Sequence, residues 1–161
     1  TQLAMEMLKS RSDMRIVHIP YKGAAPALQD TIAGFVAAKI DSYITSMPQI
    51  KARRLKALGV TSASRMPQAP DIPSIAEQGY PGYDTAIWLG VVAPKGTPKE
   101  VLSKLEQNIN AVIKEKEIAQ RLYDDGYNAR AGSASDLAAL IRREIPQWRQ
   151  LIGEMRIGAA D

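Results

Sequence analysis

The chain has 161 residues, 45% of them hydrophobic and 24% charged, which is typical of one globular domain. It contains no cysteine and a single histidine, His18, so disulfides, thiol nucleophiles, thiolate metal sites and histidine metal clusters are all excluded. The net charge is +4, but only residues 51–56 form a basic cluster, and no aromatic side chains accompany it. This pattern does not favour nucleic-acid binding.

Helices and strands alternate in the first part of the sequence. The hydrophobic periodicity predicts an amphipathic helix first, and the β-branched run Ile16, Val17 and Ile19 predicts a strand after it. The predicted elements are a helix at 1–11, a strand at 15–20, a helix at 26–33, a strand at 39–44, a helix at 48–53 and a strand at 55–61. Such alternation predicts an α/β fold with a parallel or mixed sheet.

Prolines interrupt the middle of the chain. Three of them between residues 62 and 73 predict a loop, which Pro73 ends by opening a short helix that stops at Gly79. Residues 83–93 then read as a strand of unusual length, in which Gly90 permits a bend. A strand of this kind is a candidate crossover between two lobes.

The last third of the chain is predominantly helical. We expect helices at 98–116, 117–125 and 133–155, with a brief strand at 127–131 between the last two. The segments 97–100 and 133–136 both supply a side-chain oxygen at the N-cap and an acid three residues later. Pro146 should kink the last helix or end its first half.

The predicted helix at 26–33 begins without a cap. Pro26 suits the first helical position and Gly34 suits a left-handed C-cap, but Ala25 has no side-chain oxygen. The N–H groups from Ala24 to Leu28 therefore need an outside partner. Water is one candidate; an anion is the other, since a helix N-terminus carries partial positive charge.

Three segments then identify a family. They are PYKGAAPA (20–27), PDIPSIAEQGYPGY (70–83) and WLGVVAPKGTP (88–98). In this order and at this spacing they closely resemble the substrate-binding proteins of tripartite tricarboxylate transporters, the Bug-type extracytoplasmic solute receptors. The resemblance extends over nearly the whole chain.

The resemblance implies a fold and a division into parts. The fold is α/β, like the second type of periplasmic binding protein, whose two lobes close on a ligand. The chain corresponds to the C-terminal half of such a receptor. By this comparison residues 1–86 are most of the second lobe, 87–93 are a crossover strand, and 94–161 are helices that pack on the first lobe.

The resemblance also implies ligand-binding residues. The turn Gly23, Ala24 and Ala25 matches a loop whose backbone amides hold a ligand carboxylate, and Thr45 and Ser46 match a second pocket loop. Many relatives have aspartate where Thr45 stands, so we expect a ligand with carboxylates and no ammonium. Two aromatic side chains complete the predicted site: Tyr21, as a weaker candidate, and Trp88, which either lines the cleft or packs beneath the hinge.

The function implied is the binding of small carboxylates and their delivery to a membrane permease, in the periplasm. No enzymatic activity, cofactor, metal or nucleic-acid partner is expected. Two alternatives stay open at this stage. One is a truncated module that binds nothing or self-associates as a homodimer through its C-terminal helices, and the other is the small-acid effector domain of a regulator. A hydrolase is disfavoured, since the sequence has no nucleophile elbow and only one histidine.

Overall fold

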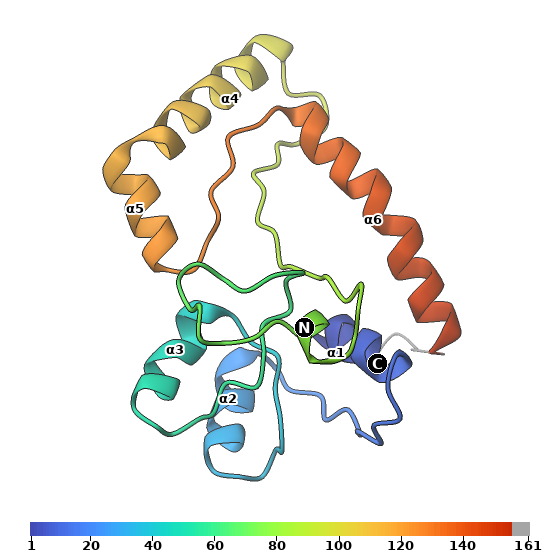
Figure 1. Ribbon diagram of the computed structural model, residues 1–161. Coiled ribbons are helices and arrows are strands. Elements are labelled where there is room, and N and C mark those ends of the chain that lie inside the picture. The colour runs from blue at the N-terminus through green and yellow to red at the C-terminus, as the bar shows by residue number, and fades with distance from the viewer. Residues whose placement is uncertain (156–161) are drawn as a thin grey trace. The chain divides into compact units, whose positions relative to one another are not determined.

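The computed structural model describes residues 1–155, in which helices are joined by irregular segments (Figure 1). Two compact units make up the chain: residues 1–87 together with the chain from Leu151, and residues 88–150. The elements are α1 (Gln2–Ser10), α2 (Ala24–Ile32), α3 (Tyr43–Lys51), the 3-10 helix η1 (Ala76–Gln78), α4 (Lys99–Lys114), α5 (Lys116–Asp124) and α6 (Ala134–Glu154). The end of the predicted segment 94–161 lies outside the described residues.

The strand predictions are wrong. No strand forms at 15–20, 39–44, 55–61, 83–93 or 127–131, and pairing within residues 1–155 is limited to one parallel bridge between Val60 and Ser74. The β-branched residues that suggested strands remain open to solvent, and Val17 and Val92 are 84% and 82% exposed. A strand requires a neighbouring segment to pair with its backbone groups, and side-chain composition cannot supply that neighbour.

The buried core lies in the first unit. The predicted N-terminal helix is confirmed as α1, and it buries Ala4 and Met7. Tyr83 is fully buried, and its hydroxyl donates a hydrogen bond of 2.8 Å to the carbonyl of Ala4. The Arg11 guanidinium lies 5.9 Å from the centre of the tyrosine ring. Burial raises the pKa of Tyr83 to about 12, so this hydroxyl stays protonated and keeps its bond to α1 across the physiological range.

A capping box organises the segment after the proline-rich loop. The Ser74 N–H donates to Glu77 Oε2 at 2.7 Å, and the Glu77 N–H donates in return to Ser74 Oγ at 3.2 Å. Arg65 donates to both oxygens of Glu77, at 3.1 and 3.2 Å. The predicted loop is confirmed, and the predicted short helix is confirmed as η1, which ends at Gly79 with φ +102°.

Residues 58–60 pack tightly against this capped segment. A Cβ added to Gly59 would come within 2.6 Å of the Gln78 side-chain nitrogen, which donates to the Leu58 carbonyl at 3.0 Å. The Val60 N–H donates to the Pro73 carbonyl at 2.9 Å. An added Cβ would displace the Gln78 side chain and lie 3.3 Å from the Pro73 carbonyl oxygen, so a residue without a side chain fits best here.

In the second unit, α4 holds the start of α6. Asn110 exchanges two hydrogen bonds with the backbone of Gly132, at 2.9 and 3.0 Å. Glu106 accepts a bond of 2.7 Å from the Ala134 N–H. Ser133 and Asp136 form the predicted capping box, in which the Ser133 N–H donates to Asp136 at 2.7 Å.

Two expectations for these helices are wrong. Thr97 does not cap α4, because the helix begins after Pro98 and the Thr97 hydroxyl donates instead to the Pro94 carbonyl at 2.9 Å. Pro146 does not end α6, which continues through it to Glu154. The periodic apolar face on both sides of Pro146 outweighs the one lost backbone bond. Gly90 lies against α6, where an added Cβ would meet Leu137 at 3.1 Å.

We expect Tyr83→Phe to reduce the free energy of unfolding by about 1 kcal/mol, because it removes one buried hydrogen bond to α1 while keeping the ring. Urea unfolding followed by circular dichroism measures this change. Tyr80→Phe is the matched control in the same unit, since the Tyr80 hydroxyl has no hydrogen bond among residues 1–155. Equal stability of the two variants would contradict the assignment.

The Glu77 carboxylate makes stability depend on pH. The Ser74 N–H and then Arg65 hold the pKa of Glu77 below its usual value. A carboxyl with a lowered pKa in the folded state stabilises the fold above its unfolded pKa of about 4.3, and this contribution is lost as the pH falls through the folded value.

We therefore expect Glu77→Gln to be less stable than the parent chain at pH 7, and the difference to shrink at pH 3. Urea unfolding at the two pH values tests this. Asp71→Asn, an exposed acid near the same segment, serves as the control and should have little effect. A difference of constant size at both pH values would argue against the capping role.

Candidate functional site

The start of α2 leaves backbone donors without partners. The helix begins at Ala24, two residues before the predicted start, so Pro26 is its third residue. Leu28 consequently lies within the helix and is not one of the open donors. The N–H groups of Gly23, Ala24 and Ala25 donate to no acceptor among residues 1–155, no side chain caps this end, and all three residues are exposed. These donors are the ones an outside group can reach.

Glycines set both ends of α2. Gly23, the N-cap, has φ +123°, a conformation that L-residues rarely adopt. The predicted C-cap at Gly34 is confirmed, with φ +82°. The Gly34 and Phe35 N–H groups donate to the carbonyls of Thr31 and Asp30, at 3.2 and 2.9 Å, which is a Schellman motif.

Thr45 and Ser46 lie in the first turn of α3. The sequence placed them in a loop and started the helix at Pro48, which is wrong, because α3 begins at Tyr43 and Pro48 lies inside it. The Ser46 N–H bonds to the Ser42 carbonyl at 3.1 Å. The Thr45 hydroxyl lies 2.8 Å from the Ser42 hydroxyl and 3.0 Å from the Ser42 carbonyl.

One lysine connects the two helix starts. Lys39 Nζ donates to the Ala24 carbonyl at 2.8 Å and to Asp41 Oδ2 at 2.9 Å. Asp41 Oδ1 accepts a bond of 2.9 Å from the N–H of Ser42, the N-cap of α3. The sequence analysis missed this pair, although opposite charges two residues apart in an extended run were a readable signal, since such residues share one face.

Tyr21 borders the same turn. Its hydroxyl donates to Asp30 Oδ2 at 2.6 Å, which joins the segment entering the turn to the body of α2. This hydrogen bond raises the pKa of Tyr21, with smaller contributions from burial and from the Asp30 charge. The hydroxyl is thus engaged within the protein, and what it can offer a ligand is mainly the ring.

The seven predicted site residues divide between the two units. Tyr21, Gly23, Ala24, Ala25, Thr45 and Ser46 belong to the first. Trp88 belongs to the second, where its indole N–H donates to Glu144 Oε2 at 2.9 Å. Trp148 donates to the same oxygen at 3.4 Å, so both indoles are anchored to α6. His18 is exposed and has no hydrogen bond in the described part of the chain.

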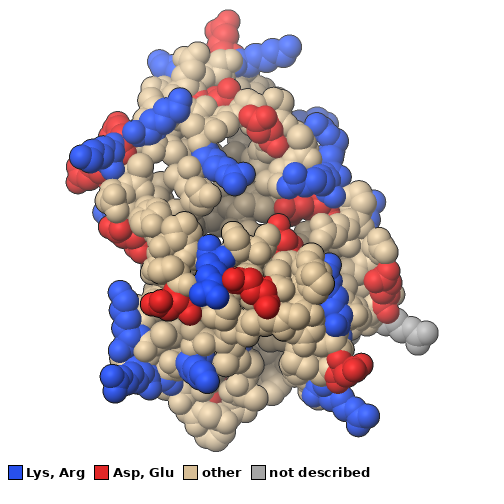
Figure 2. Space-filling model, viewed as in Figure 1, with Lys and Arg blue, Asp and Glu red and all other residues tan. Residues whose placement is uncertain are grey.

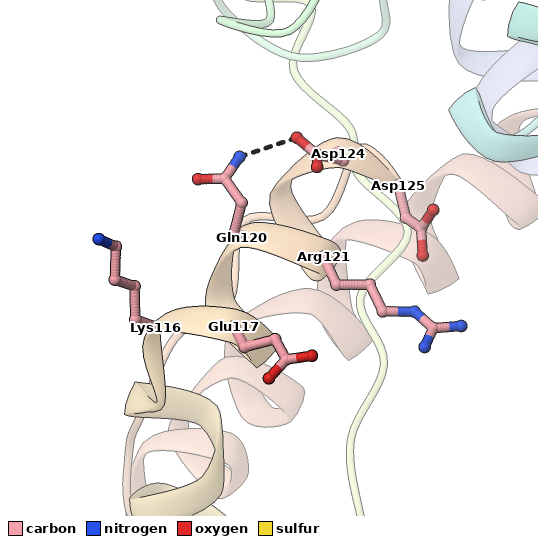
Figure 3. Close-up of a pocket in the computed structure, with 6 residues that line it drawn as sticks. All are labelled: Lys116, Glu117, Gln120, Arg121, Asp124 and Asp125. Carbon is pink, nitrogen blue, oxygen red and sulfur yellow. Dashed lines mark hydrogen bonds between the residues drawn. The ribbon is translucent and has the colours of Figure 1, made fainter.

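Other surface features do not form a better site. A depression on α5 is lined by charged and amide side chains of one helix and its end, so it cannot enclose a ligand from two sides (Figure 3). Figure 2 shows acidic and basic side chains interspersed over the face that it presents. Residues 1–155 bring together no group of three metal-ligating side chains. No helix among them is both long enough and apolar enough to cross a bilayer.

Comparisons with known proteins agree on one family. The family model described as "Tripartite tricarboxylate transporter family receptor" matches residues 1–157. A Pseudomonas sp. (strain P51) protein, the UPF0065 protein in the tcbD-tcbE intergenic region, is 40% identical over 158 residues, which are 98% of this chain and 47% of that protein.

Solved structures resemble this chain over almost its whole length. The R. palustris protein Rpa4515, solved with adipate, is 34% identical with a TM-score of 0.90, covering 96% of this chain and 52% of that one. The periplasmic binding protein BugD is 32% identical with a TM-score of 0.80 and the same coverage. The chain thus spans about half the length of these relatives. Its fold is that of an α/β periplasmic binding protein, as predicted, even though the strands are not paired in residues 1–155.

Proposed function

Because the chain belongs to the receptor family of tripartite tricarboxylate transporters, a family of solute receptors and not of enzymes, we propose that it holds a carboxylate of a transported solute at the start of α2. One observation carries this proposal. The three N–H groups of Gly23, Ala24 and Ala25 are exposed, and no group among residues 1–155 pairs with them. A carboxylate matches such donors in charge and in hydrogen-bonding capacity.

An uncapped start is not enough by itself to mark a site. α4 also begins without a side-chain cap, so the contrast between capped and uncapped helices is smaller than the sequence suggested. The start of α2 differs in two respects. Its N-cap glycine holds φ at +123°, and a lysine joins it to the start of α3, where no side chain caps the helix either. We propose that Thr45 and Ser46 contribute to the site from α3.

The charges around these helix starts favour an acid without an amino group. An ammonium group would need a free carboxylate, but Asp30 is bonded to Tyr21, and Asp41 to Lys39 and Ser42. Thr45 offers a hydroxyl and no charge. Adipate, the compound solved with the R. palustris relative, has two carboxylates and no nitrogen. We propose dicarboxylates of this kind as ligands, with no cofactor.

The remaining assignments follow the relatives. We propose that residues 1–86 belong to the second lobe of a receptor, 87–93 to a crossover and 94–161 to helices that pack on the first lobe. A relative is described as a periplasmic binding protein, so we propose that this protein acts in the periplasm, with a membrane permease as its partner. Tyr21 would then border the ligand through its ring.

Self-association is a second property that the surface favours. Val101, Leu102, Leu105 and Val112 on α4 are all more than two-fifths exposed, so this apolar stripe is largely open to solvent. An uncovered apolar face of this kind favours association with a second copy. We propose a homodimer formed through the C-terminal helices.

We expect succinate to shift the amide resonances of residues 23–25 in NMR titrations of the 161-residue chain, with a dissociation constant on the order of millimolar, because a few solvent-exposed hydrogen bonds contribute little each. Aspartate should bind more weakly than succinate. Tighter binding of aspartate, or no amide shift with any dicarboxylate, would refute the proposed ligand class.

Glycine substitutions at the two ends of α2 supply matched variants for this titration. Gly23→Ala and Gly34→Ala each force a side chain into a positive φ, and neither added Cβ meets an atom within 4 Å. Both should therefore lower stability through backbone strain alone. Only Gly23→Ala should also weaken the succinate shifts.

We expect the sedimentation coefficient of the chain to rise with protein concentration, as a monomer–dimer equilibrium requires. Leu105→Lys combined with Val112→Lys should abolish the rise by placing charges in the apolar stripe. Gln107→Lys adds a charge at an exposed position on the opposite side of α4 and should leave the rise unchanged. A chain that stays monomeric at all concentrations would exclude the homodimer.

A further inference from the structure

We propose that Lys39 and Asp41 are positioning residues, which fix the spacing between the starts of α2 and α3, and that Lys39 neutralises the Asp41 carboxylate bonded to the start of α3. This inference rests on the proposed carboxylate site. It adds two residues that contribute no atom to the turn itself and that neither the family resemblance nor the helix caps would have indicated.

The connection is continuous from one helix to the other. It runs from the Ala24 carbonyl through Lys39 Nζ to Asp41, from Asp41 to the Ser42 N–H, and from the Ser42 hydroxyl to Thr45. Every link is between 2.8 and 2.9 Å long. The two segments that carry the predicted ligand residues are therefore held by one chain of hydrogen bonds.

Both charged side chains are shielded from water. The Lys39 side chain is 15% exposed and that of Asp41 is 8% exposed. Both oxygens of Asp41 are used, one by Lys39 and one by Ser42, whereas Lys39 uses two of its three donors. Removing the lysine would leave a shielded carboxylate without its countercharge, which is costly.

The charge of Asp41 makes the role more than structural. The carboxylate bonds to the N-cap residue of α3 and is joined through Lys39 to the first residue of α2. Lys39 neutralises it, so an anionic ligand meets the backbone donors without facing a negative neighbour. Without the lysine, the Asp41 charge would repel any carboxylate at either helix start.

Four substitutions separate this role from general stability. The chain of 161 residues is titrated with succinate, and the amides of residues 23–25 and 43–45 are followed by NMR. Lys39→Met should weaken succinate binding about tenfold, since it leaves Asp41 uncompensated. The double variant Lys39→Met with Asp41→Asn should recover most of that loss, although it removes still more of the connection. Lys39→Arg should bind like the parent chain, and Lys56→Met, an exposed lysine of the same unit, is the charge control.

The recovery in the double variant is interpreted together with urea unfolding of the same variants, because removing both partners of a structural ion pair also restores stability. A Lys39→Met chain that is folded but binds succinate about tenfold more weakly is the result that a merely structural pair would not give. A double variant weaker than Lys39→Met would overturn the proposal. So would Lys39→Met spectra, recorded without succinate, in which the Ala24 and Ser42 amides match those of the parent chain.

The proposed function and this inference can fail separately. If the parent chain takes up no succinate, the proposed function falls. The coupling of the two helix starts is then still decided by the succinate-free amide shifts of Lys39→Met against Lys56→Met. If the parent chain binds and Lys39→Met binds equally well, the proposed function stands and the positioning role is refuted.

Discussion

Each helix begins with N–H groups that the helix itself cannot pair, and the way this chain meets that constraint explains much of its structure. Carboxylates close two of these starts, Glu77 at the 3-10 helix and Asp136 at α6, and both lie in segments whose hydrogen bonds hold neighbouring parts of a unit together. At α2 and α3 no side chain of residues 1–155 caps the start of the helix. Asp41 pairs with Lys39 and with the Ser42 N–H, and the donors at the start of α2 face solvent.

Apolar side chains are buried in one part of the molecule and exposed in the irregular segments. Buried side chains among residues 1–155 gather in the first unit around Tyr83, whose hydroxyl reaches back to α1. In contrast, the apolar residues of the irregular segments, such as Val17 and Leu89, stay exposed. These segments have the apolar, β-branched composition of strands, but within the described part of the chain no neighbouring segment pairs with them as a strand. The apolar stripe of α4 is likewise exposed to solvent. Such surfaces are the basis of the self-association that we propose.

The proposed site works by leaving backbone donors at the start of α2 unpaired within the described residues, while the nearby Asp41 is neutralised by Lys39. The Tyr21 hydroxyl occupies one oxygen of Asp30, and Lys39 neutralises Asp41. The nearby carboxylates of Asp30 and Asp41 already have partners within the protein. Selectivity for acids without an amino group would then arise because neither carboxylate is wholly free to bind an ammonium group. An ion pair in this position adds little to stability, but it controls the local charge that a ligand meets.

The sequence by itself determined the family, the helices with strong apolar periodicity, the capping box at Ser133, and the turn at Gly23. These features depend on residues close together in the chain, whose local geometry leaves few alternatives. Strand pairing, the true starts of α2 and α3, and the bond from Lys39 to Ala24 were decided by the tertiary structure. Each of these depends on which distant segment supplies a partner, and neither Pro26, Pro48 nor a β-branched run carries that information.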